Sequence, residues 1–158
     1  MKHETHHRDF ALHPQLAQDT YPVTDLELCR VLLMNEARYP WLILVPRRAG
    51  IREIHELTTA ERQQLWAESD KVSRVLMTLF QPDKLNIAAL GNAVAQLHVH
   101  HLARFQRDAA WPAPVWGKFP PDPYAPEAAI VRCETLRSCL QNAPHPDSEG
   151  AESLRASF

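Results

Sequence analysis

The sequence predicts an α+β domain in which helices pack against a mostly antiparallel sheet. Three observations support this fold class. Short apolar runs bounded by turn residues occur in two pairs, a long stretch with helical periodicity separates the pairs, and a second helical stretch follows near the C-terminus. No internal repeat interrupts this order, so we expect a single domain over residues 1–142.

The first pair of strands is predicted at Leu26–Met34 and Trp41–Val45, which are mostly apolar runs. The segment NEARYP between them supplies the turn, because Pro40 is poorly suited to a central strand. The sequence therefore predicts a hairpin. Residues 1–22 are polar and without a clear period, and they predict only a lead-in segment with at most a short helix.

The long helix has a distinct start. Thr58 and Glu61 form the T-x-x-E pattern of a capping box, and Pro82 ends the periodic stretch. Apolar residues recur at helical spacing in between, at Leu65, Val72, Val75, Leu76, Leu79 and Phe80. This pattern indicates a face packed in the core.

The second pair of strands is predicted at Lys84–Leu90 and Gln96–Phe105, joined by a turn at Gly91 and Asn92. The Pro- and Trp-rich segment that follows, WPAPVWGKFPPDPYAP, excludes regular structure over its length. Pro126 is well placed to open a last helix. Residues 143–158 are polar, which predicts a flexible C-terminal tail.

The composition narrows the possible functions. The formal net charge of −2 and pI of about 6.5 disfavour a nucleic-acid partner held by bulk charge, although a local site for a small phosphorylated ligand remains open. No apolar run approaches the roughly 20 residues of a membrane span, and the N-terminus does not resemble a signal peptide. Three cysteines without C-x-x-C spacing predict neither disulfides nor a zinc site. A cytoplasmic location is therefore expected.

The segment QLHVHHLARF holds three of the nine histidines. Side chains alternate between the two faces of a strand. One face then carries Gln96, His98, His100 and Leu102. His101 belongs to the opposite face with Leu97 and Val99, whose apolar character marks that face as the buried one. His98 and His100 are therefore predicted to share one site from which His101 is excluded.

Three interpretations of this pair stay open at the level of spacing. The imidazoles can be hydrogen-bonded locally, as structural histidines are. They can be two metal ligands, although no nearby Cys, Asp or Glu completes a shell. They can also act in nucleophilic catalysis, since a neutral imidazole is a competent nucleophile that suits phosphoryl or nucleotidyl transfer through a phosphohistidine.

The letters QLHVHHLA resemble the signature of the histidine triad (HIT) superfamily, and AWPAPVWG at residues 110–117 resembles a segment common in its proteobacterial members. The resemblance extends from about Val23 to Gly117 and so covers the expected core of the domain. It implies a HIT-like fold, with a sheet of about five strands covered by a long helix and a C-terminal helix. It also implies a homodimer.

The resemblance assigns roles to three residues. His98 matches the nucleophile that attacks the α-phosphate of a nucleotide, and His100 matches the histidine that contacts a phosphate or leaving-group oxygen. Gln96 takes the place of the first signature histidine and cannot act as an acid or base. The implied activity is hydrolysis or nucleotidyl transfer on a dinucleoside polyphosphate or nucleoside phosphoramidate, with water releasing the monophosphate. No metal or cofactor is required.

The chain also departs from the family pattern. Ala49 and Gly50 stand where many relatives carry a further histidine, and Ala93 stands where relatives have Ser or Thr. These changes favour, as alternatives, a nucleotide sensor of the same fold that turns nothing over. A metal-binding protein that uses His98 and His100 is a further alternative.

Supporting residues follow from the same resemblance. Asn35 matches a position that faces the ribose hydroxyls, and Asn86 and Asn92 match amide positions that contact phosphate oxygens. Among candidate phosphate-binding arginines (Arg47, Arg48, Arg104 and Arg107), strand alternation favours Arg104, because it shares the face of His98. Trp111 and Trp116 are expected either to line the site or to cover the sheet.

Overall fold

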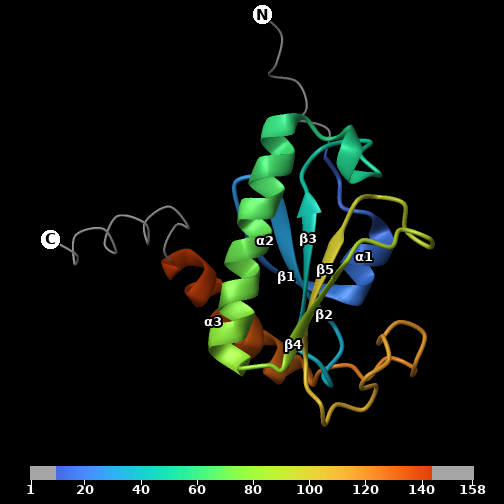
Figure 1. Cartoon of the computed structure of the whole chain (residues 1–158), viewed down its shortest axis with the longest axis vertical. Helices are drawn as coiled ribbons and strands as arrows, with labels where there is room; N and C mark the ends of the chain where they lie inside the picture. The colour runs from blue at the N-terminus through green and yellow to red at the C-terminus, as the bar shows by residue number, and fades with distance from the viewer. Residues whose placement is uncertain (1–9, 144–158) are drawn as a thin grey trace, which may run out of the picture.

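The computed structural model describes residues 10–143, in which one sheet carries helices on both faces (Figure 1). The elements in chain order are α1 (Pro14–Asp19), β1 (Thr20–Asp25), β2 (Cys29–Met34), β3 (Trp41–Pro46), the 3-10 turn η1 (Ile54–Glu56), α2 (Thr59–Phe80), β4 (Lys84–Ala88), β5 (Val99–Arg104) and α3 (Pro126–Asn142). The strand order is β1-β2-β3-β5-β4, and every neighbouring pair is antiparallel. The predicted α+β fold with a five-stranded sheet is confirmed.

The strand β1 corrects the prediction for the first 22 residues, which assigned no strand there. Thr20–Asp25 pairs with β2 at the edge of the sheet, and its register shifts between Pro22 and Thr24. An edge strand tolerates a proline and an irregularity of this kind, because one side of its backbone needs no partner. The polar character and missing period of residues 1–22 therefore gave no sign of this edge strand. The predicted short helix is present as α1.

The other predicted elements are confirmed with small changes of boundary. The β2–β3 hairpin forms, and α2 begins directly after the reciprocal hydrogen bonds of Thr58 and Glu61. The helix ends at Gln81, whose φ of 49° is left-handed, just before Pro82. β5 begins at Val99 rather than at Gln96, because the Leu97 N–H donates to the Ile51 carbonyl outside the sheet.

Two apolar clusters lie on the two faces of the sheet. On the helix face, defined by Val31, Leu42, Leu44 and Val99, the sheet packs against α2 and α3. On the site face, defined by Leu32, Trp41, Ile43 and Leu102, it packs against Leu16 of α1 and against Ala110 and Val115 of the Trp-rich loop. Figure 1 shows α2 and α3 on one side of the sheet and α1 on the other. Both faces are therefore buried, whereas the sequence predicted only the first.

The predicted flexible tail lies outside the described residues apart from Ala143. None of the helices within residues 10–143 is long and apolar enough to cross a membrane.

Candidate active site around His98 and His100

His98 and His100 come together on the site face, as strand alternation predicts. Their ring centroids are 4.9 Å apart and the rings are nearly perpendicular, at 73°. His98 lies just before β5 and His100 lies within it, opposite Ile43 of β3. Both side chains are buried, with 7% and 6% of their surface exposed. Only a small part of each imidazole is therefore accessible to a ligand.

The backbone decides which nitrogen of His98 is available. Its Nδ1 lies 2.7 Å from the carbonyl oxygen of Gln96. Because a carbonyl oxygen only accepts, Nδ1 carries a hydrogen and donates it. In neutral His98, Nε2 then holds an unshared electron pair, and no hydrogen bond to that atom exists among residues 10–143. This is the tautomer that a nitrogen nucleophile needs.

The indole of Trp41 imposes the opposite tautomer on His100. Trp41 Nε1 donates to His100 Nδ1 at 3.0 Å, and an indole N–H can only donate. Neutral His100 therefore carries its proton on Nε2. Burial, together with the neighbouring His98 and His101, lowers the pKa of His100 to about 3, so the ring is neutral at physiological pH. The site thus pairs an electron-pair donor with a hydrogen-bond donor.

His101 lies on the helix face, and both of its nitrogens are engaged. Nδ1 donates to the Val99 carbonyl at 3.1 Å, so Nε2 accepts from the Ser69 hydroxyl of α2 at 2.7 Å. Its side chain is fully buried. The sequence-based exclusion of His101 from the site is confirmed.

The Gln96 side chain does not point toward a ligand but binds the N-terminal segment. Its Oε1 accepts from the His13 N–H and its Nε2 donates to the Ala11 carbonyl, both at 2.9 Å. These two hydrogen bonds tie the segment ahead of α1 to the residues just before β5. Both polar atoms of the Gln96 amide are therefore occupied by the backbone of this segment. Its backbone carbonyl, by contrast, contacts His98 Nδ1.

Arg104 shares the site face, as strand alternation predicts, and its guanidinium is engaged by other residues of the chain. Only 1% of its surface is exposed. Its guanidinium binds both carboxylate oxygens of Asp108, at 2.8 and 3.1 Å, as well as Asn86 Oδ1 at 2.7 Å and the Ala113 carbonyl at 2.9 Å. Trp111 packs over the same guanidinium. These contacts hold the Trp-rich loop against the sheet, and they engage the Arg104 guanidinium and Asn86 Oδ1 in the structure described.

A cavity of about 200 Å³ opens beside the Trp41–His100 pair, and Asn35, Tyr39 and Trp116 line it with Trp41. The Asn35 Oδ1 accepts from the backbone N–H of Tyr124. The Tyr39 hydroxyl and the Trp116 indole nitrogen are buried without a hydrogen-bond partner among the described residues. A buried polar group without a partner is costly. Both atoms belong to residues that line this cavity.

A small hollow of about 20 Å³ lies at His98, lined by Arg52, Gly91, Gln96 and His98 among others. The positive φ of Gly91, 78°, lets the chain turn there. Asn92 is exposed on the same loop. Arg52 was not among the predicted arginines, because nothing in its sequence neighbourhood distinguishes it.

The remaining predicted arginines make local contacts. Arg47 donates to the carbonyls of Leu26 and Glu27, and Arg48 pairs with Glu61 at the start of α2. Arg107 packs over Phe105. These contacts tie loops to neighbouring elements and give no indication of phosphate binding.

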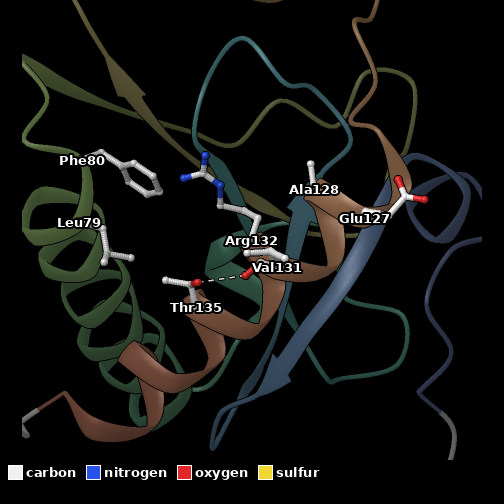
Figure 2. Close-up of a pocket in the computed structure, with 7 residues that line it drawn as sticks. All are labelled: Leu79, Phe80, Glu127, Ala128, Val131, Arg132 and Thr135. Atoms are coloured by element: carbon white, nitrogen blue, oxygen red, sulfur yellow. Dashed lines mark hydrogen bonds between the residues drawn. The ribbon is translucent and has the colours of Figure 1, made fainter.

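A cavity of about 560 Å³ lies elsewhere, between the end of α2 and the start of α3 (Figure 2). Arg132 lies over the Phe80 ring, 4.7 Å from its centroid, and Leu79, Val131 and Thr135 complete the wall. This cavity belongs to the helical layer on the helix face, away from the histidine pair. Within residues 10–143 no three His, Cys, Asp or Glu side chains are grouped to hold a metal ion.

The fold and site define a class of protein: an antiparallel α+β domain with a buried histidine pair that points away from its main helical layer. Residues 15–107 match the HIT domain. The chain therefore belongs to the HIT family.

Solved structures agree with this assignment. A histidine triad protein from Marinobacter aquaeolei VT8 is 50% identical, with a TM-score of 0.82 over 85% of this chain and 98% of that one. Histidine triad proteins from Bradyrhizobium japonicum (46% identity, TM-score 0.80, 83% and 98% coverage) and Sinorhizobium meliloti 1021 (41%, 0.81, 84% and 98%) are similar too. A search of curated proteins gave no match.

Proposed function

We propose that this protein is a nucleotide hydrolase or nucleotidyl transferase that acts at an α-phosphate through a covalent nucleotidyl-His98. One observation carries this proposal: the opposite polarity of the two Nε2 atoms, an electron pair on His98 beside an N–H on His100. A phosphoryl centre needs both, because the nucleophile attacks phosphorus while fixed donors meet the charge that develops on its oxygens.

The reaction proceeds in two steps. His98 Nε2 attacks the α-phosphorus, the bond from phosphorus to the leaving group breaks, and a nucleotidyl-histidine forms. The ring then bears positive charge, and the Gln96 carbonyl stabilises it by accepting from Nδ1 at 2.7 Å. Water then attacks phosphorus and the nitrogen–phosphorus bond breaks, which releases a nucleoside monophosphate. His100 Nε2–H donates to a phosphoryl oxygen in both steps.

The nucleoside portion is assigned to the cavity lined by Asn35, Trp41 and Trp116. The two buried donors without partners, Tyr39 Oη and Trp116 Nε1, support a polar ligand there. The phosphates are assigned to the hollow at His98, where Arg52 and Asn92 are the side chains proposed to contact them. The proposal thus replaces Arg104 and Asn86 as ligands, because those two side chains bind each other.

A homodimer and a cytoplasmic location complete the proposal. The edge strand β4 leaves Ile87 45% exposed, and Leu90 directly after it is 49% exposed. Exposed apolar residues at an unpaired strand edge favour association with a second copy. Cys29, Cys133 and Cys139 are all free thiols, which suits a reducing compartment.

The test is release of AMP from diadenosine polyphosphates and adenosine phosphoramidates by wild type and by His98→Ala. Loss of the nucleophile is expected to lower kcat at least roughly 10³-fold. His55→Ala is the matched control, because His55 is an exposed histidine of η1 outside the site. Equal turnover by wild type and His98→Ala contradicts the proposal. Nucleotide binding without any turnover favours the sensor instead.

A further inference from the structure

Trp41 is the residue that decides which nitrogen of His100 carries the proton. It is the first residue of β3, and its indole Nε1 donates to His100 Nδ1 at 3.0 Å across the β3–β5 pair. Because the indole never accepts, the bond exists only while Nδ1 is unprotonated. The neutral ring must then present Nε2–H to the ligand.

Three rings lock this arrangement. The centroid of Trp41 lies 5.6 Å from that of His100 and 5.8 Å from that of Trp116, and Trp116 lies 5.4 Å from His100. All three contacts are edge-on, and Trp41 is 6% exposed. A flip of the His100 ring would put Cδ2 in the place of Nδ1 and so break the hydrogen bond from the Trp41 indole. The geometry therefore holds one tautomer.

The fixed tautomer of His100 has a chemical consequence for the leaving group. To act as a general acid, His100 must first carry protons on both nitrogens. Its Nδ1–H would then face the Trp41 N–H, two donors with no acceptor between them. His100 can therefore donate a hydrogen bond to the ligand but cannot transfer a proton to the leaving group.

The two other signature positions offer no substitute. His98 is the attacking group, and its Nδ1–H is held by the Gln96 carbonyl. The Gln96 amide is bound to the backbone of Ala11 and His13, and an amide has no proton to transfer. A leaving group must therefore depart without a proton from any of these three residues.

We infer that Trp41 is a positioning residue that holds His100 as a pure hydrogen-bond donor, so that leaving groups stable as anions are favoured over amines. The inference rests on the proposed function. In the first step the phosphorus–oxygen bond breaks, its electron pair stays on the leaving oxygen, and the leaving group departs as an anion. In the second, water supplies hydroxyl to phosphorus, the nitrogen–phosphorus pair returns to His98, and a proton passes to solvent.

The kinetic test uses a matched set of substrates with one nucleoside. Aryl esters of AMP with phenols of decreasing acidity, from 4-nitrophenol to phenol, are compared with adenosine 5′-phosphoramidate. Without acid catalysis, kcat/KM is expected to fall roughly a hundredfold or more from the most to the least acidic leaving group, with the amine slowest. The inference is overturned if kcat/KM does not change with the acidity of the leaving group, or if the phosphoramidate is cleaved faster than the phenyl ester. Either result leaves the proposed function intact.

The spectroscopic test requires no turnover. In ¹⁵N NMR spectra of the wild-type protein, His100 is expected to show a protonated Nε2 and an unprotonated Nδ1. Trp41→Phe keeps an aromatic ring but removes the N–H. In this variant we expect both tautomers of His100 to be present. We also expect the range of kcat/KM across the leaving groups to become about tenfold smaller. Trp116→Phe is the matched control, since Trp116 packs on the same ring without a hydrogen bond to it. It should leave the tautomer unchanged.

The outcomes separate the two proposals. A wild-type His100 protonated at Nδ1 overturns the inference even if Trp41→Phe fails to fold. Absence of turnover on every substrate overturns the proposed function, and the wild-type spectrum then decides the role of Trp41 by itself.

Discussion

His100 and His101 are neighbours in the chain, both are buried, and burial lowers the pKa of both, yet they lie in two different regions of the molecule. On the helix face, Val99 and Ser69 occupy both nitrogens of His101. On the site face, Trp41 occupies one nitrogen of His100, and Nε2 has no partner among residues 10–143. The two rings differ in how many nitrogens lack a partner among the described residues, none in His101 and one in His100. Burial alone therefore does not tell whether a histidine nitrogen is left for a ligand.

The largest expected difference between the two histidines is kinetic. His100→Ala removes a fixed donor to the phosphoryl oxygens, so kcat is expected to fall about 10²–10³-fold. His101→Ala is the paired variant, and folded protein should keep kcat within a few-fold because the side chain faces α2. Steady-state AMP release from both variants measures this, with circular dichroism as the check on folding. Similar losses of kcat in the two variants would break the comparison.

The next effect is on stability as a function of pH. Burial lowers the pKa of His101 from its ordinary 6.5 to about 4, although its bond to the Val99 carbonyl opposes the shift. Below pH 6.5 the unfolded chain therefore binds a proton that the folded chain does not. The contribution of His101 to the free energy of unfolding should fall as pH drops from 6.5 toward 4, by on the order of 3 kcal/mol. Above pH 6.5 this contribution should not change with pH.

Urea unfolding across that pH window checks the expectation, with His101→Gln as the comparison. The variant should reduce the slope, and His100, whose pKa is also lowered, should account for part of the slope that remains. An unchanged slope would assign the pH dependence to other groups.

A smaller effect is expected from the partner of His101. Ser69→Ala leaves the buried Nε2 acceptor without its donor, which should lower the free energy of unfolding by about 1–3 kcal/mol with kcat unchanged. Chemical denaturation and AMP release on the same preparation give both numbers. Ser73→Ala on the same helix is the control. Ser73 makes no hydrogen bond to His101 but lines a second groove, which α2 forms with Cys139 and Asn142 of α3. A loss of kcat without a loss of stability would contradict the structural role of this pair.

Local sequence was sufficient for the elements whose signals are local. The capping box of Thr58 and Glu61 marks the start of α2 within a few residues, and Pro126 marks the start of α3. Strand alternation correctly separates His101 from His98 and His100. The strand β1 was missed because residues 1–22 are polar and show no clear period, and an edge strand that tolerates Pro22 leaves no stronger local signal.

Side-chain partners distant in the chain were not accessible in this way. Gln96 looks like a replacement for a catalytic histidine, yet its amide partners lie 83 and 85 residues away, in the N-terminal segment. Arg104 lies on the predicted face, but Asp108 and Asn86 occupy its guanidinium. Trp41 and Tyr39 carry no motif at all. They became candidates only through the register of β3 with β5 and the cavity beside it.

By itself, the sequence determined the fold class, the main helix, and the sharing of one face by His98 and His100, because these depend on periods of two and 3.6 residues along the chain. The tertiary structure alone decided the tautomer of each histidine. A tautomer depends on which atom lies opposite each nitrogen, the Gln96 carbonyl for His98 and the Trp41 indole for His100. That opposition follows from strand pairing and loop path, which no local pattern encodes.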